Sequence, residues 1–292
     1  MRSNSHGGHR PPCRGSIAVP VCPAIPLQLL GPLYCGRGVA SVPLHDGDAG
    51  WERLRERIVS CTACPRLVEY RTLVARTKRP AYASWSYWGR PVPGFGDPAA
   101  RLVIVGLAPA AHGANRTGRM FTGDSSGDFL VGALFRAGFA NQPRSEHAED
   151  GLRLIDAFMT APVRCAPPDN RPLPEEMERC YPFLEQEMAL LHRCRVILAL
   201  GRIGFDVARR LLLSRAAHDP PARELLRHAR FSHGATIEPG GDLPALVASY
   251  HPSRQNTQTG RLTAAMMDEV LARVRRLLQE ADGQSGVRAD RS

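Results

Sequence analysis

The distribution of apolar residues along the chain predicts four buried strands. Apolar runs occur at residues 102–105, 155–163, 196–200 and 246–250. Short runs of this kind, without polar alternation, are typical of parallel strands that are covered on both faces. Amphipathic stretches between them predict helices at residues 51–58, 67–73, 127–137, 174–192, 202–213 and 263–278. Strands that alternate with helices predict an α/β fold, with three layers (α/β/α) around a central four-stranded, mostly parallel sheet.

Composition changes along the chain and predicts one folded domain between two polar ends. Residues 1–46 are rich in Pro, Gly and Ser and show neither helical nor alternating periodicity. We expect them to be a disordered extension, or the product of a start codon placed too early. Residues 47–281 hold all the predicted strands and helices, and residues 282–292 form a polar tail. The stretch 215–241 is rich in His and Arg and predicts irregular structure.

Charge favours nucleic acid as a partner. The chain of 292 residues carries a formal net charge of +10, and Lys78 is its single lysine among 38 basic residues. A GC-rich genome would explain arginine in place of lysine, but it would not explain the net charge. An Arg-rich basic surface is typical of proteins that bind nucleic acid. Because no apolar run is long enough to span a membrane and no signal peptide is evident, we expect a cytoplasmic protein. We also expect a monomer, which its nucleic-acid partner would associate with the nucleoid.

Eight cysteines are too few for a disulfide-rich secreted protein of this length. Cys61 and Cys64 form a C-x2-C pair, and Cys165 and Cys180 form a second, wider pair much later in the chain. Four thiolates suit tetrahedral zinc or a [4Fe–4S] cluster, and their spacing does not separate the two; a redox disulfide or free thiols are further alternatives. Cys194 precedes an apolar strand and is expected in the core. The other three cysteines, within residues 1–46, fit no common metal template.

A long loop follows the first predicted strand and is the best candidate for a ligand site. Gly106 ends the strand, small and turn-forming residues follow, and a polar segment then leads to a helix that Ser125 or Ser126 can cap. In open α/β sheets, ligands bind at the carboxyl ends of the strands, where this loop would lie. The loop contains neither G-x-G-x-x-G nor G-x-x-x-x-G-K-[ST], so the sequence does not support a nucleotide phosphate cradle.

Two segments resemble motifs of the family 5 uracil-DNA glycosylases, the iron–sulfur type of that superfamily. The segment 106–124, GLAPAAHGANRTGRMFTGD, is similar to the first motif, and the segment 250–261, YHPSRQNTQTGR, is similar to the H-[PV]-S-x-x-N motif. The resemblance covers about residues 51–278. It implies a uracil-DNA glycosylase-like fold and a [4Fe–4S] cluster on Cys61, Cys64, Cys165 and Cys180.

The resemblance also implies an activity. A monofunctional glycosylase of this type flips uracil out of DNA, hydrolyses the N-glycosidic bond and leaves an abasic site. We expect the chain to act on double- and single-stranded DNA, on uracil first and on hypoxanthine and other deaminated bases as well. Leu107, Ala108 and Ala161 occupy positions where related enzymes carry polar or acidic side chains. A site without such hydrogen-bonding groups discriminates weakly between bases.

The resemblance assigns roles to individual residues. Asp124, His251 and Asn170 would be catalytic: His251 would stabilise the departing base, Asp124 would stabilise the cationic sugar and orient water, and Asn170 would contact base or water. Phe121 would stack on the base, and Gly106, Ala108 and His112 would complete the substrate site. The loop with Ser253, Arg254, Gln255 and Asn256 would enter the minor groove, and Arg116 and Arg119 would contact phosphate.

Each of these residues also has a structural interpretation. Phe121 could be a core residue, Asp124 a helix N-cap, Asn170 a turn residue and His251 a structural histidine. At the level of the whole chain, the main alternative is a non-catalytic iron–sulfur nucleic-acid-binding protein or redox sensor, which needs the cysteines and the charge but no pocket. A zinc-stapled α/β hydrolase of a small substrate is a second alternative, and it would need an activated nucleophile.

Overall fold

The four predicted strands form the parallel centre of the sheet. The structure is a computed structural model that describes residues 47–289, and the side chains of residues 49–282. Strands β2 (Leu102–Val105), β3 (Ala157–Thr160), β4 (Val196–Leu200) and β6 (Ala245–Ser249) pair in parallel in the order β3-β2-β4-β6. Two short strands, β1 (Phe95–Gly96) and β5 (Thr236–Ile237), add antiparallel edges. The sheet of the described residues therefore has six strands rather than the predicted four.

The predicted helices are all present, and the structure adds three more. The predicted ones are α1 (Gly47–Val59), α2 (Pro65–Thr77), α4 (Ser125–Arg136), α5 (Pro174–Leu190), α6 (Gly201–Arg215) and α9 (Ala264–Ala289). The added ones are α3 (Ala114–Thr117), α7 (Pro220–His228) and α8 (Arg254–Gln258), together with the 3-10 turns η1 (Pro80–Tyr82) and η2 (Pro168–Asn170).

Two helices correct the sequence analysis. Helix α7 lies in the stretch that was predicted to be irregular, and Asp219 caps it by accepting a hydrogen bond from the Ala222 N–H group at 3.0 Å. Helix α9 continues to Ala289, past its predicted end and into the segment that was predicted to be a polar tail. The predictions for residues 1–46, and for the last three residues of the tail, lie outside the described residues. No described helix is long and apolar enough to cross a membrane.

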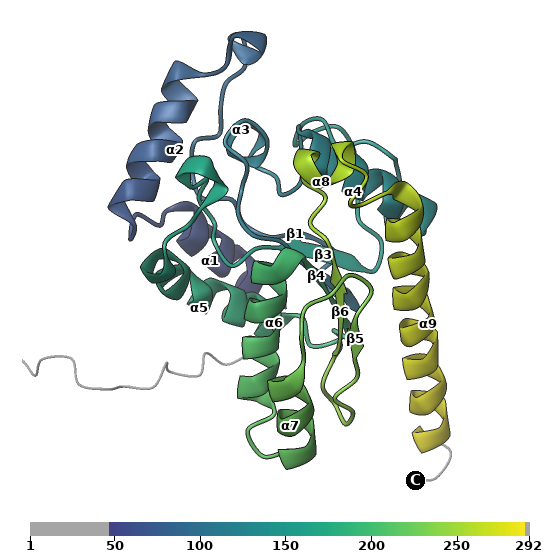
Figure 1. Cartoon of the computed structure of the whole chain (residues 1–292). Coiled ribbons are helices and arrows are strands. Elements are labelled where there is room, and N and C mark those ends of the chain that lie inside the picture. The colour runs from purple at the N-terminus through teal and green to yellow at the C-terminus, as the bar shows by residue number, and fades with distance from the viewer. Residues whose placement is uncertain (1–46, 290–292) are drawn as a thin grey trace, which may run out of the picture. The chain divides into compact units, whose positions relative to one another are not determined.

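Alternating side chains of the strands supply two separate cores. Leu102 and Ile104 of β2 pack in one core together with residues of α4 and α9. Val103 and Val105 point to the opposite face, where they pack with residues of α5, α6 and α7. All four residues of β2 are buried, as a strand between two helical layers must be. The predicted α/β/α layering is confirmed (Figure 1).

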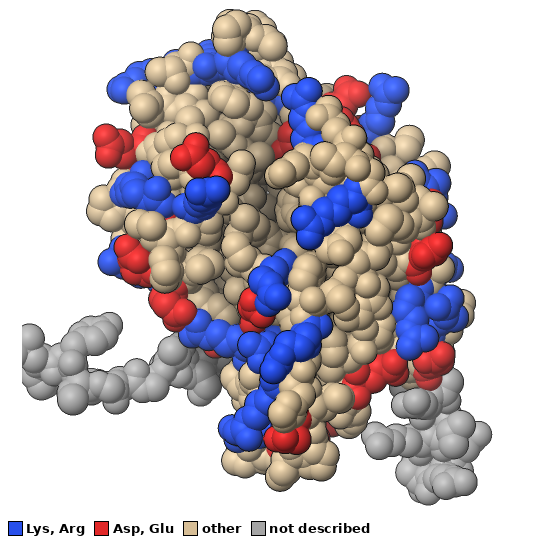
Figure 2. Space-filling view, in the orientation of Figure 1, with Lys and Arg blue, Asp and Glu red and all other residues tan. Residues whose placement is uncertain are grey.

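The strand order creates a crevice at the carboxyl end of β2. The chain passes from β2 to β3 on one side, and later to β4 and β6 on the other side. This reversal is the position at which open α/β sheets bind ligands. Figure 2 shows a hollow in this face, in the region where Figure 1 places α3 and α8, with Lys and Arg side chains on both sides of it.

Candidate active site

A cavity of about 490 Å³ opens at the carboxyl ends of the parallel strands. Its walls come from parts of the segment 107–126 after β2, from Ala161 and Asn170 after β3, and from residues of the segment 251–255 after β6. The volume is in the range of small-molecule sites. Of the residues predicted for the site, the cavity brings together Ala108, Phe121, Asp124, Asn170, His251, Ser253, Arg254 and Gln255.

Three predicted site residues lie just outside this cavity. Gly106 is buried beneath Phe121, and a Cβ at this position would come within 2.8 Å of the Phe121 ring. The His112 ring forms a hydrogen bond of 3.0 Å with the Tyr87 hydroxyl instead of lining the cavity. The Asn256 side-chain amide donates to the His251 carbonyl oxygen at 2.9 Å. Gly106 and Asn256 therefore support the walls of the cavity from behind.

Asp124 is both a helix cap and a cavity residue. Its Oδ1 atom accepts hydrogen bonds from the N–H groups of Ser126 and Gly127, each at 2.9 Å, at the start of α4. Burial raises the pKa of the carboxyl above its ordinary value, while the two N–H groups and the charge of Arg116 act in the opposite direction. The capping interpretation is confirmed, and it does not exclude a chemical role, because Oδ2 is not engaged in the cap.

His251 enters the cavity as a neutral imidazole. It lies two residues after the end of β6, and burial lowers its pKa to about 4. Among the described residues its ring nitrogens have no hydrogen-bond partner, and the ring lies 6.2 Å from that of Phe121, centroid to centroid. A neutral imidazole in this position has an N–H group available to a ligand.

Phe121 adopts a backbone conformation that costs energy. Its φ angle is 49°, in the left-handed region, which a residue with a bulky side chain rarely enters. The conformation places the ring over Gly106 at the end of β2 and beside His251. Strain of this kind is commonly found at functional sites, where the surrounding structure enforces it.

The structure corrects the prediction that Arg116 and Arg119 contact phosphate. Arg119 is 5% exposed, and its guanidinium donates to Asp150 at 2.7 Å and to the hydroxyls of Thr122 and Ser145. Arg116 is 4% exposed, and its guanidinium donates to the carbonyl oxygens of His112 at 2.8 Å and Gly123 at 2.7 Å. Both arginines hold the segment around Phe121 and Asp124 in place, so neither presents a free guanidinium to DNA.

The segment after His251 has the exposure that a DNA contact requires. Ser253 caps α8 by accepting from the Asn256 N–H group at 3.3 Å, and Arg254 and Gln255 are exposed at the cavity rim. Asn170 is also exposed at the rim, and its φ angle of 55° is left-handed like that of Phe121. These side chains can meet a ligand without rearrangement of the core.

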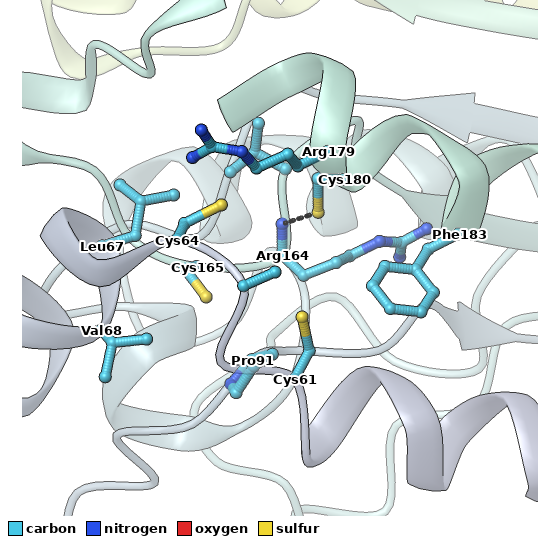
Figure 3. A pocket seen from close by; sticks show the side chains of 12 residues that line it. Cys61, Cys64, Leu67, Val68, Pro91, Arg164, Cys165, Arg179, Cys180 and Phe183 are labelled. Carbon is cyan, nitrogen blue, oxygen red and sulfur yellow. Dashed lines mark hydrogen bonds between the residues drawn. The ribbon is translucent and has the colours of Figure 1, made fainter. Parts of the chain in front are cut away.

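The four predicted metal ligands surround a second, smaller cavity. Cys61 and Cys64 lie between α1 and α2, Cys165 lies in the loop after β3, and Cys180 lies on α5. Figure 3 shows these side chains around one space, with a hydrogen bond of 3.3 Å from the Arg164 N–H group to the Cys180 sulfur. Cys194 lies elsewhere, buried in the core on the α5 and α6 face as predicted.

The surroundings of these thiols fit a large anionic group. Burial raises the pKa of Cys165 to about 12 and that of Cys180 to about 11; the charge of Arg71 opposes the rise at Cys165, and the charge and N–H group of Arg164 oppose it at Cys180. Arg164 is 1% exposed and pairs through Nη2 with the Glu187 carboxylate at 2.6 Å, while its Nε and Nη1 atoms have no hydrogen-bond partner among the described residues. Among the described residues, no three His, Cys, Asp or Glu side chains are arranged to hold a single metal ion. Four cysteines around one space, with arginines beside them, have the donor atoms and the opposite charge that a negatively charged [4Fe–4S] cluster would require.

Several residues that build the site were not identified from the sequence. Met120 and Ser126 line the cavity, and Gly113 lies directly against Asp124. Tyr82 and Trp85 pack on Arg116 from a segment that comes earlier in the chain. Gly113 is one of several small residues in the loop, Ser126 was a candidate helix cap, and Trp85 belongs to an aromatic segment, whereas Met120 and Tyr82 left no signal in the sequence.

Comparisons with known proteins agree with this geometry. A family model described as the uracil DNA glycosylase superfamily matches residues 93–275. A type-5 uracil-DNA glycosylase of Mycobacterium leprae is 48% identical over 235 residues, which cover 80% of this chain and 98% of that protein. One from Thermus thermophilus is 49% identical over 228 residues, covering 77% and 97%, and one from Pyrobaculum aerophilum is 44% identical over 225 residues, covering 77% and 92%.

Proposed function

The chain belongs to the uracil-DNA glycosylase superfamily, and on that premise we propose how its cavity excises uracil from DNA. The reaction hydrolyses the bond between the base and the sugar and leaves an abasic site. One observation supports the proposal best. A single cavity at the carboxyl end of β2, where the strand order reverses, brings together Phe121, Asp124 and His251 from two loops. A non-catalytic nucleic-acid-binding protein would have no use for such a cavity.

The cavity receives the base after it leaves the DNA helix. A glycosylase must rotate its target nucleotide out of the duplex, because the bond to be broken is otherwise inaccessible. Phe121 offers a ring face at the bottom of the cavity, fixed by its left-handed backbone and by the absence of a side chain at Gly106. A flipped uracil that stacks on this ring places its edge toward His251.

His251 stabilises the base as it departs. Cleavage leaves negative charge on the base, and an N–H donor aimed at its oxygen lowers the barrier. The imidazole, whose pKa burial lowers to about 4, is neutral near pH 7 and keeps one N–H group that can donate to the base. A donor of this kind is worth about 3–4 kcal/mol, or a factor of roughly 10² to 10³ in rate.

Asp124 stabilises the sugar and orients the attacking water. The sugar becomes cationic as the bond breaks, and a carboxylate on the other side of the reacting atoms compensates that charge. Oδ1 is held by the two N–H groups of the α4 cap, so Oδ2 is the atom that remains for the reaction. Asn170, which also lines the cavity, contributes a polar contact to base or water.

The apolar lining supports a broader range of bases. Leu107, Ala108 and Ala161 all line the cavity and offer no side-chain hydrogen bond to the edge of a base. A site with few such groups rejects unlike bases only weakly. We therefore propose that hypoxanthine and other deaminated bases are further substrates, in double- or single-stranded DNA.

The four cavity cysteines would hold a [4Fe–4S] cluster. When bound, the cluster supplies iron–thiolate bonds that join the turn between α1 and α2 to the loop after β3 and to α5. Arg71, Arg164 and Arg179 lie close enough to affect the pKa values of these cysteines and would compensate its negative charge. Without the cluster, the segment 161–173, which carries Ala161 and Asn170, would lose its bonds to the turn between α1 and α2 and to α5.

A strand-cleavage assay tests the proposed activity. A labelled duplex with one uracil is incubated with the protein and then heated in alkali, which cuts the strand at abasic sites. We expect cutting at the uracil position only after alkali, and similar results with hypoxanthine at a lower rate. Binding of the uracil duplex without any alkali-labile site would support the non-catalytic alternative.

A further inference from the structure

Arg116 is a buried arginine that has no carboxylate partner. Its guanidinium lies between the rings of Tyr82 and Trp85, with the Cζ atom 3.9 Å and 4.0 Å from the two ring centroids. Within the described residues it forms no ion pair, and its Nη1 atom has no hydrogen-bond partner. Burying a charge without an opposite charge costs free energy, which the two ring contacts offset only in part. A residue kept in such a position is therefore a candidate for a functional role.

The hydrogen bonds of Arg116 join the two backbone segments on either side of the Asp124 carboxylate. Its Nε atom donates to the carbonyl oxygen of His112 at 2.8 Å, and its Nη2 atom donates to the carbonyl oxygen of Gly123 at 2.7 Å. His112 immediately precedes Gly113, and Gly123 immediately precedes Asp124. A single guanidinium therefore fixes the distance between Gly113 and Asp124.

Gly113 determines where the second oxygen of Asp124 can lie. A Cβ atom at Gly113 would overlap Oδ2 of Asp124. Gly113 has a φ of −99°, so other residues are excluded by this contact and not by a left-handed backbone. Because Oδ1 is committed to the α4 cap, the contact with Gly113 defines the position of the one remaining carboxylate oxygen.

Arg116 is also the cation that acts on this carboxylate from within the protein. Burial raises the pKa of Asp124, and the charge of Arg116 opposes the effect. The other charged or titratable groups around it are Asp128 on the next turn of α4, His251 and Arg254 across the cavity, and Arg144 and Glu146 beyond Asp128. Since His251 is neutral and Arg254 is exposed at the rim, neither replaces Arg116.

We infer that Arg116 and Gly113 are positioning residues for the reaction: the guanidinium, held between Tyr82 and Trp85, clamps the backbone so that Oδ2 of Asp124 lies against Gly113 as a carboxylate facing the cavity. The inference rests on the proposed role of Asp124. It gives Arg116 a function in place of the phosphate contact that the sequence suggested.

The test compares single-turnover uracil release by the full-length protein over a range of pH values. In Arg116→Gln we expect the rate near pH 7 to fall at least tenfold, and the acid limb of the profile to move to higher pH. Arg116→Lys should keep the acid limb of the wild type but not its rate, because the charge remains and the paired hydrogen bonds do not. Arg144→Gln, an exposed arginine near the same segment, is the matched control and should leave both unchanged.

Two further measurements make each outcome decisive. Affinity for a uracil duplex should change less than twofold in Arg116→Gln, which distinguishes positioning from phosphate binding. The rate of uracil release should also fall at least tenfold in Gly113→Ala. If Arg116→Gln does not fold, the rate of Gly113→Ala tests the inference in its place. Wild-type rate and profile in folded Arg116→Gln or Gly113→Ala, with Asp124→Ser inactive, would overturn this inference alone. Wild-type rate in Asp124→Ser would instead remove the proposed role of Asp124 and the inference with it.

Discussion

Replacing Asp124 by serine separates its capping role from its proposed chemical role. Serine is a good N-cap residue, and its hydroxyl can accept from one of the N–H groups that Oδ1 now binds at 2.9 Å. We expect a stability change of no more than about 1 kcal/mol, since caps of this kind are worth about that much. Serine carries no charge, so the stabilisation of the cationic sugar would be lost, about 3–4 kcal/mol or a factor of roughly 10² to 10³ in rate.

The assay measures the first-order release of uracil with enzyme in excess over a labelled duplex, and thermal unfolding of both proteins under the same conditions. In the wild type the rate should fall as pH drops through the pKa of Asp124, which burial raises, because the protonated carboxyl cannot compensate positive charge. Folded Asp124→Ser that releases uracil at close to the wild-type rate would refute the reasoning. Asp124 would then be a helix cap and nothing more.

Four further outcomes follow from the same geometry. His251→Ala should slow the release of every base by roughly 10² to 10³, with little change in duplex affinity. Burial alone would raise the pKa of Asp150, but Arg119 and backbone N–H groups lower it from 3.8 to about 2. The wild type therefore has about 2 kcal/mol of folding stability above pH 4 that it loses as the pH falls toward 2, and Asp150→Asn should lack this contribution. Arg254→Ala should weaken duplex binding and reduce the slope of log affinity against log salt by about 1. Serine at any of the four cavity cysteines should bleach a brown, iron- and sulfide-containing protein, whereas Cys194→Ala should not.

Each of these outcomes has a clear opposite. Normal turnover by His251→Ala would contradict the proposed role of His251 as a hydrogen-bond donor to the base. An Asp150→Asn protein with the acid unfolding curve of the wild type would show that the ion pair between Arg119 and Asp150 adds no net stability. Affinity that does not depend on salt would mean that the basic surface serves another partner. Full occupancy by zinc in protein purified without air would contradict the cluster.

The central strands and the long helices could be predicted because each is long enough to show its own period. The edge strands β1 and β5 have two residues each, which is too short for any alternation to be visible. They form because β3 and β6 already present unpaired edges. Helix α7 did leave a signal, Asp219 followed by two prolines at the first helical positions, but the surrounding His and Arg residues obscured its apolar face.

The location of the cavity could be predicted because its loops follow strands, and the resemblance to the family supplied its residues, whereas the burial of the arginines could not be predicted. Arg116 and Arg119 stand in a polar loop, where residue type alone suggests exposure. Their burial depends on partners far away in the sequence, the rings of Tyr82 and Trp85 for the first and the Asp150 carboxylate for the second. Contacts of this kind are set by tertiary structure, and no local pattern indicates them.

The most direct test of the central claim is detection of the free base. The full-length protein is incubated with a duplex that contains a single isotopically labelled uracil, and both the small-molecule fraction and the DNA strand are analysed by mass spectrometry. Hydrolysis of the N-glycosidic bond predicts one equivalent of free uracil and an intact strand that has lost the base and gained a hydroxyl at the sugar. Strand cleavage without free uracil, or a bound duplex whose mass is unchanged, would contradict it.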